Sequence, residues 1–220
     1  VKGLAAGLRI ADVEQGTANY WFLRARGKLG AFLWKPSFTL RKIGKSDTSD
    51  LAVMQRAIAY HRRPDTAKAR AEIDRLASMR PSDPFVHELR GQILLESRDT
   101  GGAVRAYARA AELAPKNALI LGSLGRAYLA AGDAGRALDV LTRARARDSR
   151  NPQLLRDLAV AYANAGQNGQ ASLATAERYA LLGRGADAAV HAKRATGLLP
   201  PGSTGWRRAQ DILDAQTRKR

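Results

Sequence analysis

The pattern of apolar and polar positions over residues 84–117 predicts two helices joined by a tight turn. Gly101 and Gly102 mark the turn. Two helices pack closely only where the side chains at their crossing are small, and a ring or a leucine can then fill the space beside them. Counted from residue 84, the residues that fit this arrangement at positions 8, 11, 20, 24, 27 and 32 are Gly91, Leu94, Ala103, Tyr107, Ala110 and Pro115.

The same pattern recurs along the chain with a period of 34 residues. It is present in residues 50–83 and in residues 118–151. A fourth copy begins at residue 152, keeps the first half of the pattern and slips by half a unit after Gly166, before it ends at Pro200. Since one helical pair cannot bury its apolar stripe alone, the units must stack on one another.

This unit resembles the tetratricopeptide (TPR) repeat, which has the same length and the same signature positions. The resemblance implies an all-α fold, a TPR-type helical-repeat solenoid in which the α/α pairs form a superhelix with flanking capping helices. We expect an N-terminal amphipathic capping helix and basic connector over 1–49, the solenoid over 50–202 and a C-terminal capping helix over 203–220. The solenoid units lie near 50–83, 84–117, 118–151 and 152–202, the last with the half-unit slip. The predicted helices are 50–62, 66–79, 84–97, 101–114, 118–131, 135–147, 152–165, 168–182, 185–198 and 203–218.

Residues 18–34 predict an amphipathic helix ahead of the repeats. We expect it to cap the N-terminal end of the solenoid; a basic helix with aromatic residues could instead lie on a membrane surface. Pro36 is expected to end this helix, and residues 36–49 then form a polar, basic connector. The predicted apolar stripe contains Trp21, Phe22, Ala25, Leu29, Phe32 and Leu33, and the basic residues off the stripe are Arg24, Arg26 and Lys28.

The composition is strongly basic, since 37 Lys and Arg against 20 Asp and Glu give a formal net charge of +17. Basic residues are spread along the chain and mostly interleaved with acidic ones, which favours a solvated helical surface; contact with an acidic protein or lipid ranks above nucleic acid. The chain has no cysteine, which excludes disulfides, thiolate metal sites and a cysteine nucleophile. No run of 18 apolar residues predicts a membrane span. Because the chain starts at Val1 without signal-peptide features, we interpret it as a fragment or a processed product.

Catalytic motifs are incomplete in this sequence. His87 and Glu88 resemble the start of HExxH, the helix motif of zinc proteases, but Gly91 stands where the second histidine ligand should be. The other histidines, His61 and His191, are far away in the sequence. We therefore expect no catalytic residue, metal site or cofactor within this chain.

The candidate site is a groove for protein or peptide segments. In TPR arrays the first helix of each unit lines the concave face, and here that face is part apolar and part charged, which suits an extended peptide or a docking segment. The clamp with which some TPR proteins grip chaperone C-termini needs Lys and Asn in this groove; Gly122, Arg126, Arg156 and Val160 stand there instead. The candidate groove residues are Met54, Ile58, His61, Phe85, Glu88, Gln92, Leu95, Leu119, Arg126, Leu129, Gln153, Arg156 and Val160.

Four segments in order carry a closer resemblance: RARGKLGAFLWKP, SDTSDLAVMQRAIAYHRR, PSDPFVHELRGQILLE and LLPPGSTGWRRAQDIL. Over about residues 22–213 the chain looks like the C-terminal half of BepA-like periplasmic zinc metalloproteases, in which an HExxH domain precedes a TPR domain. The resemblance implies the accessory, partner-binding half of a zinc metalloendopeptidase active in outer-membrane protein quality control. It also implies a periplasmic location, zinc in the parent's upstream domain, and two partners, that protease domain and the outer-membrane assembly machinery.

Two other functions stay open. The chain could be a stand-alone TPR adaptor that assembles a complex without a protease domain. It could also bind anionic surfaces through the basic N-terminal helix and C-terminal tail, and such binding would depend steeply on salt. The zinc ligands and catalytic glutamate of the protease family have no counterpart in this sequence, so enzymatic activity is expected only of a longer parent protein.

Overall fold

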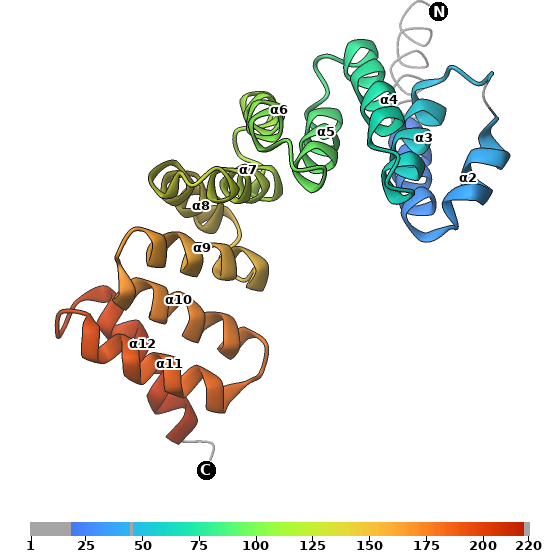
Figure 1. Ribbon diagram of the computed structural model, residues 1–220. Coiled ribbons are helices and arrows are strands. Elements are labelled where there is room, and N and C mark those ends of the chain that lie inside the picture. Colours follow the sequence, from blue (N-terminus) through green and yellow to red (C-terminus); the bar gives the residue numbers. More distant parts are fainter. Residues whose placement is uncertain (1–18, 45, 218–220) are drawn as a thin grey trace, which may run out of the picture. The chain divides into compact units, whose positions relative to one another are not determined.

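The computed structural model describes residues 19–44 and 46–217, and every regular element within these residues is an α-helix (Figure 1). The two ends of the chain lie outside the described residues: residues 1–18 and the basic tail, residues 218–220. Residues 19–33 form the first described helix, here called the leading helix. The helices that follow are α2 (Pro36–Ile43), α3 (Asp50–Arg62), α4 (Thr66–Met79), α5 (Pro84–Glu96), α6 (Thr100–Leu113), α7 (Ala118–Ala130), α8 (Ala134–Arg147), α9 (Pro152–Asn164), α10 (Asn168–Leu181), α11 (Gly185–Leu198) and α12 (Thr204–Thr217).

From α3 onward each helix matches a predicted one to within one residue at either end. The reason is local, because the capping residues follow the 34-residue period. The second helices of the first three pairs begin after aspartates that accept a hydrogen bond from the backbone N–H three residues on: Asp65, Asp99 and Asp133. Two first helices begin after asparagines in the same role, Asn117 and Asn151. The all-α prediction is confirmed.

The prediction of a polar connector over residues 36–49 is wrong in its first half, which forms α2. Pro36 begins α2 rather than only ending the helix before it. Proline fits the first helical turn because its missing N–H would be unpaired there and its fixed φ is already helical. Arg41 and Lys42 lie in the last turn, where a positive charge stabilises the helix.

Contacts divide the chain into two compact units, residues 1–93 and residues 94–220, and each unit is described by itself. The boundary falls within α5, inside the predicted second repeat. Unit 1 holds the leading helix, α2 to α4 and most of α5. Its core is formed by aliphatic residues of α3, α4 and α5 together with Ala31 of the leading helix: Val53, Met54, Ala57, Ile58, Ala69, Ile73, Leu76, Val86, Leu89 and Ile93.

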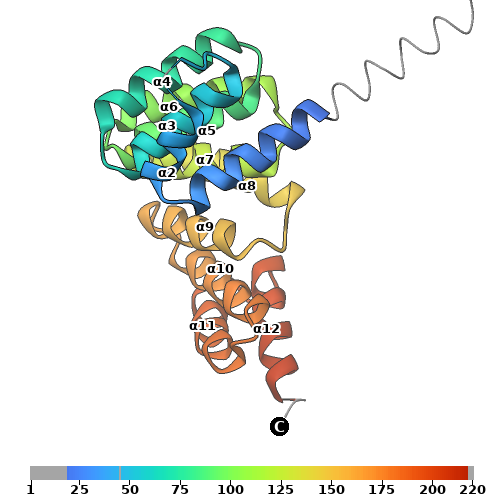
Figure 2. The same ribbon diagram turned by 90° about the vertical axis from the view of Figure 1, so that its right-hand side faces the viewer.

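In unit 2 the helices follow one another in pairs. Leu141 of α8 is fully buried against α7, at the place where Gly125 allows the two helices to approach. α10 packs against α9 on one side and α11 on the other, so one helix serves two pairs, as the half-unit slip predicts (Figure 1). α12 lies along α10 and α11 (Figure 2) and covers their apolar side with Trp206, Ile212 and Leu213.

Candidate functional site

The leading helix lies on α3 and α5, the first helices of the first two repeats. Gln55 of α3 donates a hydrogen bond to the carbonyl oxygen of Gly27 over 3.2 Å. A Cβ atom on Gly27 would lie 2.5 Å from Leu51 Cδ1, so glycine permits this close approach. On the α5 side, Lys28 pairs with Glu88 at 3.1 Å. The chain's own helix therefore covers the face of unit 1 that the repeat pattern assigns to a ligand.

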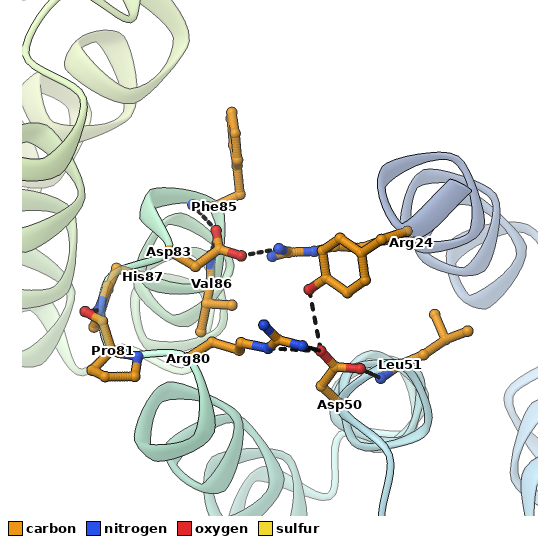
Figure 3. A network of polar contacts seen from close by, with 10 residues as sticks. Arg24, Asp50, Leu51, Arg80, Pro81, Asp83, Phe85, Val86 and His87 are labelled. Carbon is orange, nitrogen blue, oxygen red and sulfur yellow. Dashed lines mark hydrogen bonds and ion pairs between the residues drawn. The ribbon is translucent and has the colours of Figure 1, made fainter. Parts of the chain in front are cut away.

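Two half-buried acidic residues, Asp83 and Asp50, anchor the start of this contact (Figure 3). Arg24 forms an ion pair with Asp83, which also caps α5 by accepting from the backbone N–H of Phe85. Asp50 accepts hydrogen bonds from the Tyr20 hydroxyl at 3.1 Å and from Arg80 Nε at 2.8 Å. Burial raises the pKa of the Tyr20 hydroxyl, and Asp50 adds to the increase while Arg24 opposes it. Tyr20 therefore remains a protonated donor to Asp50 at neutral pH.

Most of the apolar stripe that was expected to cap the repeats faces solvent, with Phe22 62%, Leu29 59% and Leu33 70% exposed. Phe32 is the exception, since it is half-buried and packs against the core of unit 1. The side of the helix that faces α3 and α5 carries Arg24, which is 9% exposed, and the fully buried Ala31. The physical reason is that the acidic residues on α5 pair with basic residues of this side, and small residues on the same side allow close packing.

Three of the predicted groove residues of unit 1 are buried. Met54 and Ile58 belong to the core. Glu88 is 8% exposed and holds the leading helix. Phe85 stays 38% exposed, with an edge-to-face contact to a tryptophan of the leading helix at a ring-centroid distance of 6.0 Å. The half-buried members of the predicted set in this unit are His61 and Gln92.

The change Gly27→Val is expected to displace the leading helix, because its side chain would overlap Leu51. Tryptic cleavage at Arg26 should become several-fold faster, and the emission of Trp21 should shift to the red, since local opening exposes both. Ala25→Val is the matched control, because Ala25 is exposed on the same helix. Equal cleavage rates for the two variants would contradict the close packing of this helix.

The predicted groove residues of unit 2 differ from those of unit 1 in their exposure. Leu119 of α7 is 62% exposed and Val160 of α9 is 45% exposed. Three of the predicted polar residues converge on Asp157, a residue that the repeat pattern did not single out and that is 4% exposed. Its carboxylate accepts hydrogen bonds from Arg126 at 3.1 Å, Gln153 at 3.1 Å and Arg156 at 3.3 Å. The half-buried members of the predicted set in this unit are Leu95 and Leu129, which pack against the core.

Asp157 could have been found from the sequence by its spacing. Gln153 and Asp157 are four residues apart on one helix and therefore share a face. Arg126 comes from α7, 31 residues earlier, and only the packing of α7 near α9 reveals that it reaches the same carboxylate. The result is an inner face of unit 2 with two exposed aliphatic side chains and a fixed polar cluster.

The incomplete zinc-protease motif has a structural role. His87 is 8% exposed, and its Nε2 lies 2.9 Å from the carbonyl oxygen of Pro81. Over residues 19–44 and 46–217, no group of three or more His, Asp or Glu side chains could hold a metal ion. No helix in the same stretches is long and apolar enough to cross a membrane.

The fold is that of a TPR-type helical-repeat solenoid, as solved structures of MamA show. MamA of MSR-1 is 20% identical, with a TM-score of 0.60 over 74% of this chain and 96% of that chain. MamA of AMB-1 is 18% identical, with a TM-score of 0.63 over 74% and 98% of the two chains. MamA from Desulfovibrio magneticus RS-1 is 17% identical, with a TM-score of 0.63 over 73% and 93%. At these identities the likeness shows the fold alone. Comparisons with models of protein families and with curated proteins gave no match.

Proposed function

We propose that this chain is a protein-interaction module that binds an extended segment of a partner protein on the inner face of unit 2. One observation carries the proposal: the leading helix covers the inner face of unit 1, whereas Leu119 and Val160 remain exposed on α7 and α9. Exposed aliphatic residues on a repeat surface are suited to binding the apolar side chains of a peptide.

The polar cluster supports the same proposal. Asp157 holds Arg126 through Nε, and the half-exposed guanidinium group keeps its terminal nitrogens available for carbonyl oxygens of a bound main chain. Gln153 and Arg156 are fixed by the same carboxylate. A surface whose side chains are held in place before binding loses less conformational entropy when the ligand arrives.

The test is a selection of random peptides on the whole chain, followed by affinity measurements with variants. Leu119→Asp combined with Val160→Asp is expected to weaken binding of the selected peptides at least about tenfold, because burying one such side chain is worth about 1.5–3 kcal/mol. Val190→Asp is the control, since Val190 is 68% exposed on α11 and lies outside the proposed surface. The proposal would be refuted if both variants lost affinity for the selected peptides equally, or if no peptide were enriched at all.

The resemblance to BepA-like metalloproteases adds a finer proposal: the chain is the accessory half of a periplasmic protease whose zinc lies in another domain. The outward stripe of the leading helix supports it, because Phe22, Leu29 and Leu33 form an apolar face suited to packing against such a domain. The native protein should then be larger than this chain by a catalytic domain and carry about one zinc ion. A metal-free native protein no longer than this chain plus a signal peptide would leave the stand-alone adaptor.

A further inference from the structure

Unit 2 contains a depression between α9, α10 and α11, and of its lining residues the groove positions of the repeat singled out only Arg156 and Val160 (Figure 1 shows the three helices). Its volume is about 360 Å³. Its uncharged lining is mixed: Val160 and Ala163 of α9 are aliphatic, and the polar members are Asn168, Ser172 and Thr175 of α10. The residues around it that can carry a positive charge come from all three helices: Arg156, Arg178, His191 and Arg194. We call this feature the basic depression.

The positive charge of the basic depression is not neutralised from within. None of its lining residues is acidic. Asp157 is adjacent in sequence to Arg156 but is shared by three donors. Glu177 of α10 does not line the depression, because it is engaged by Arg145 and Arg208. Burial raises the pKa of the Glu177 carboxyl, although Arg145 opposes the increase.

Two of the basic groups are held in position by one ring. The Arg178 guanidinium carbon lies 5.4 Å from the centre of the Tyr179 ring, and the imidazole of His191 stacks on the same ring at 5.5 Å. Within residues 46–217 the structure pairs neither Arg178 nor Arg194 with a carboxylate. Arginines that lack an acidic partner leave a local positive potential in a concave, partly apolar site.

We infer that the basic depression binds an acidic segment of a peptide, with carboxylates on Arg178 and Arg194 and an apolar side chain on Val160 and Ala163. A guanidinium group matches a carboxylate through two parallel hydrogen bonds, which gives this pairing its strength and its geometry. The inference rests on the proposed function and names the chemistry of its partner. Val160 and Arg156 belong to both surfaces, so one extended ligand can continue from the inner face into the depression.

The lining favours a peptide over nucleic acid. Single-stranded nucleic acid is bound by aromatic rings on which bases stack, and no Phe, Tyr or Trp lines the basic depression. The lining also contains aliphatic side chains, among them Val160 and Ala163, which a phosphate backbone does not require.

The test uses the peptide selection described above and reads the sequences of the enriched peptides. Peptides selected on the whole chain are expected to be rich in Asp and Glu. Selection on Arg178→Glu with Arg194→Glu should lose this enrichment. The control is Arg105→Glu with Arg150→Glu, which changes the net charge equally at exposed positions outside the depression and should keep it. Replacing Glu by Gln in a selected peptide is expected to weaken its binding at least tenfold.

Each other outcome has a distinct meaning. Peptides that bind through Leu119 and Val160 without acidic enrichment would overturn this inference and leave the proposed function standing. Equal loss of acidic enrichment in the two charge-reversed proteins would also overturn this inference, because the effect would then follow from net charge alone. A single-stranded oligonucleotide that displaces the acidic peptide and binds more tightly would overturn it in favour of nucleic acid. If no peptide is enriched on any protein, the proposed function fails as well.

Discussion

Gly125→Ala is expected to destabilise unit 2 by about 1–3 kcal/mol, although alanine is the better helix former. A Cβ atom on Gly125 would overlap Leu141 Cγ and lie 2.5 Å from its Cδ2. Leu141 is fully buried between α7 and α8, so it cannot move away without disturbing its neighbours. Chemical unfolding followed by circular dichroism measures the change.

Gly122→Ala is the matched control on the same helix. A Cβ atom there would meet Leu154 Cδ1 at 3.7 Å, which is an ordinary contact. This variant gains helix propensity of up to about 1 kcal/mol without a clash and should be as stable as the parent chain or slightly more stable. If both alanine variants gain stability equally, the close contact between Gly125 and Leu141 does not limit the packing of α7 on α8.

Arg56→Met is expected to destabilise unit 1 by about 3 kcal/mol, because it leaves a partly buried carboxylate without its partner. Arg56 is 3% exposed, and its Nε donates to Glu72 at 2.8 Å while Nη2 donates to the same carboxylate at 3.1 Å. Its Nη1 donates to the carbonyl oxygens of Gly44 and Asp47. One side chain thus ties α3 to α4 and to the segment that follows α2. In a Trp206→Phe background, tryptophan fluorescence reports the unfolding of unit 1, where Trp21 and Trp34 lie.

The double variant Arg56→Met with Glu72→Met separates the cost of an unpaired carboxylate from the contribution of the ion pair itself. Removing both charges leaves apolar side chains of similar size, and such replacements of a buried ion pair are often close to neutral. We expect it to recover most of the lost stability. Arg75→Met, at an exposed position of α4, should change little. If Arg56→Met is as stable as the Arg75→Met control, the Arg56–Glu72 pair makes no net contribution to the stability of unit 1.

The contrast between the two units is the basis of the functional proposals. In unit 1 the leading helix is held by the pairs Arg24–Asp83 and Lys28–Glu88, and Glu88 is a predicted groove residue. In unit 2 the corresponding face keeps exposed aliphatic residues and a polar cluster around Asp157. A ligand-binding surface is expected where the repeat positions remain open, which favours unit 2.

The site could be predicted only in part. The repeat register singled out Leu119, Val160 and Arg156, and these residues are exposed. It also listed Met54 and Ile58, since repeat positions say which way a residue points within its own pair but not what else covers that face. The repeat register singled out Arg156 of the basic depression but not Arg178 or Arg194, because these arginines lie on other helices and at other positions of the repeat.

The sequence by itself determined the helices, their caps and the period of 34, because these depend on residues close together in the chain: the small residues at each crossing, the Asp and Asn caps, and the glycines of the turns. Only the tertiary structure decided which side of the leading helix is buried. Its apolar stripe predicts one answer, and two ion pairs to residues 59 and 60 positions away impose the other. A local pattern reports what a helix could bury, whereas the partners brought next to it by folding decide what it does bury.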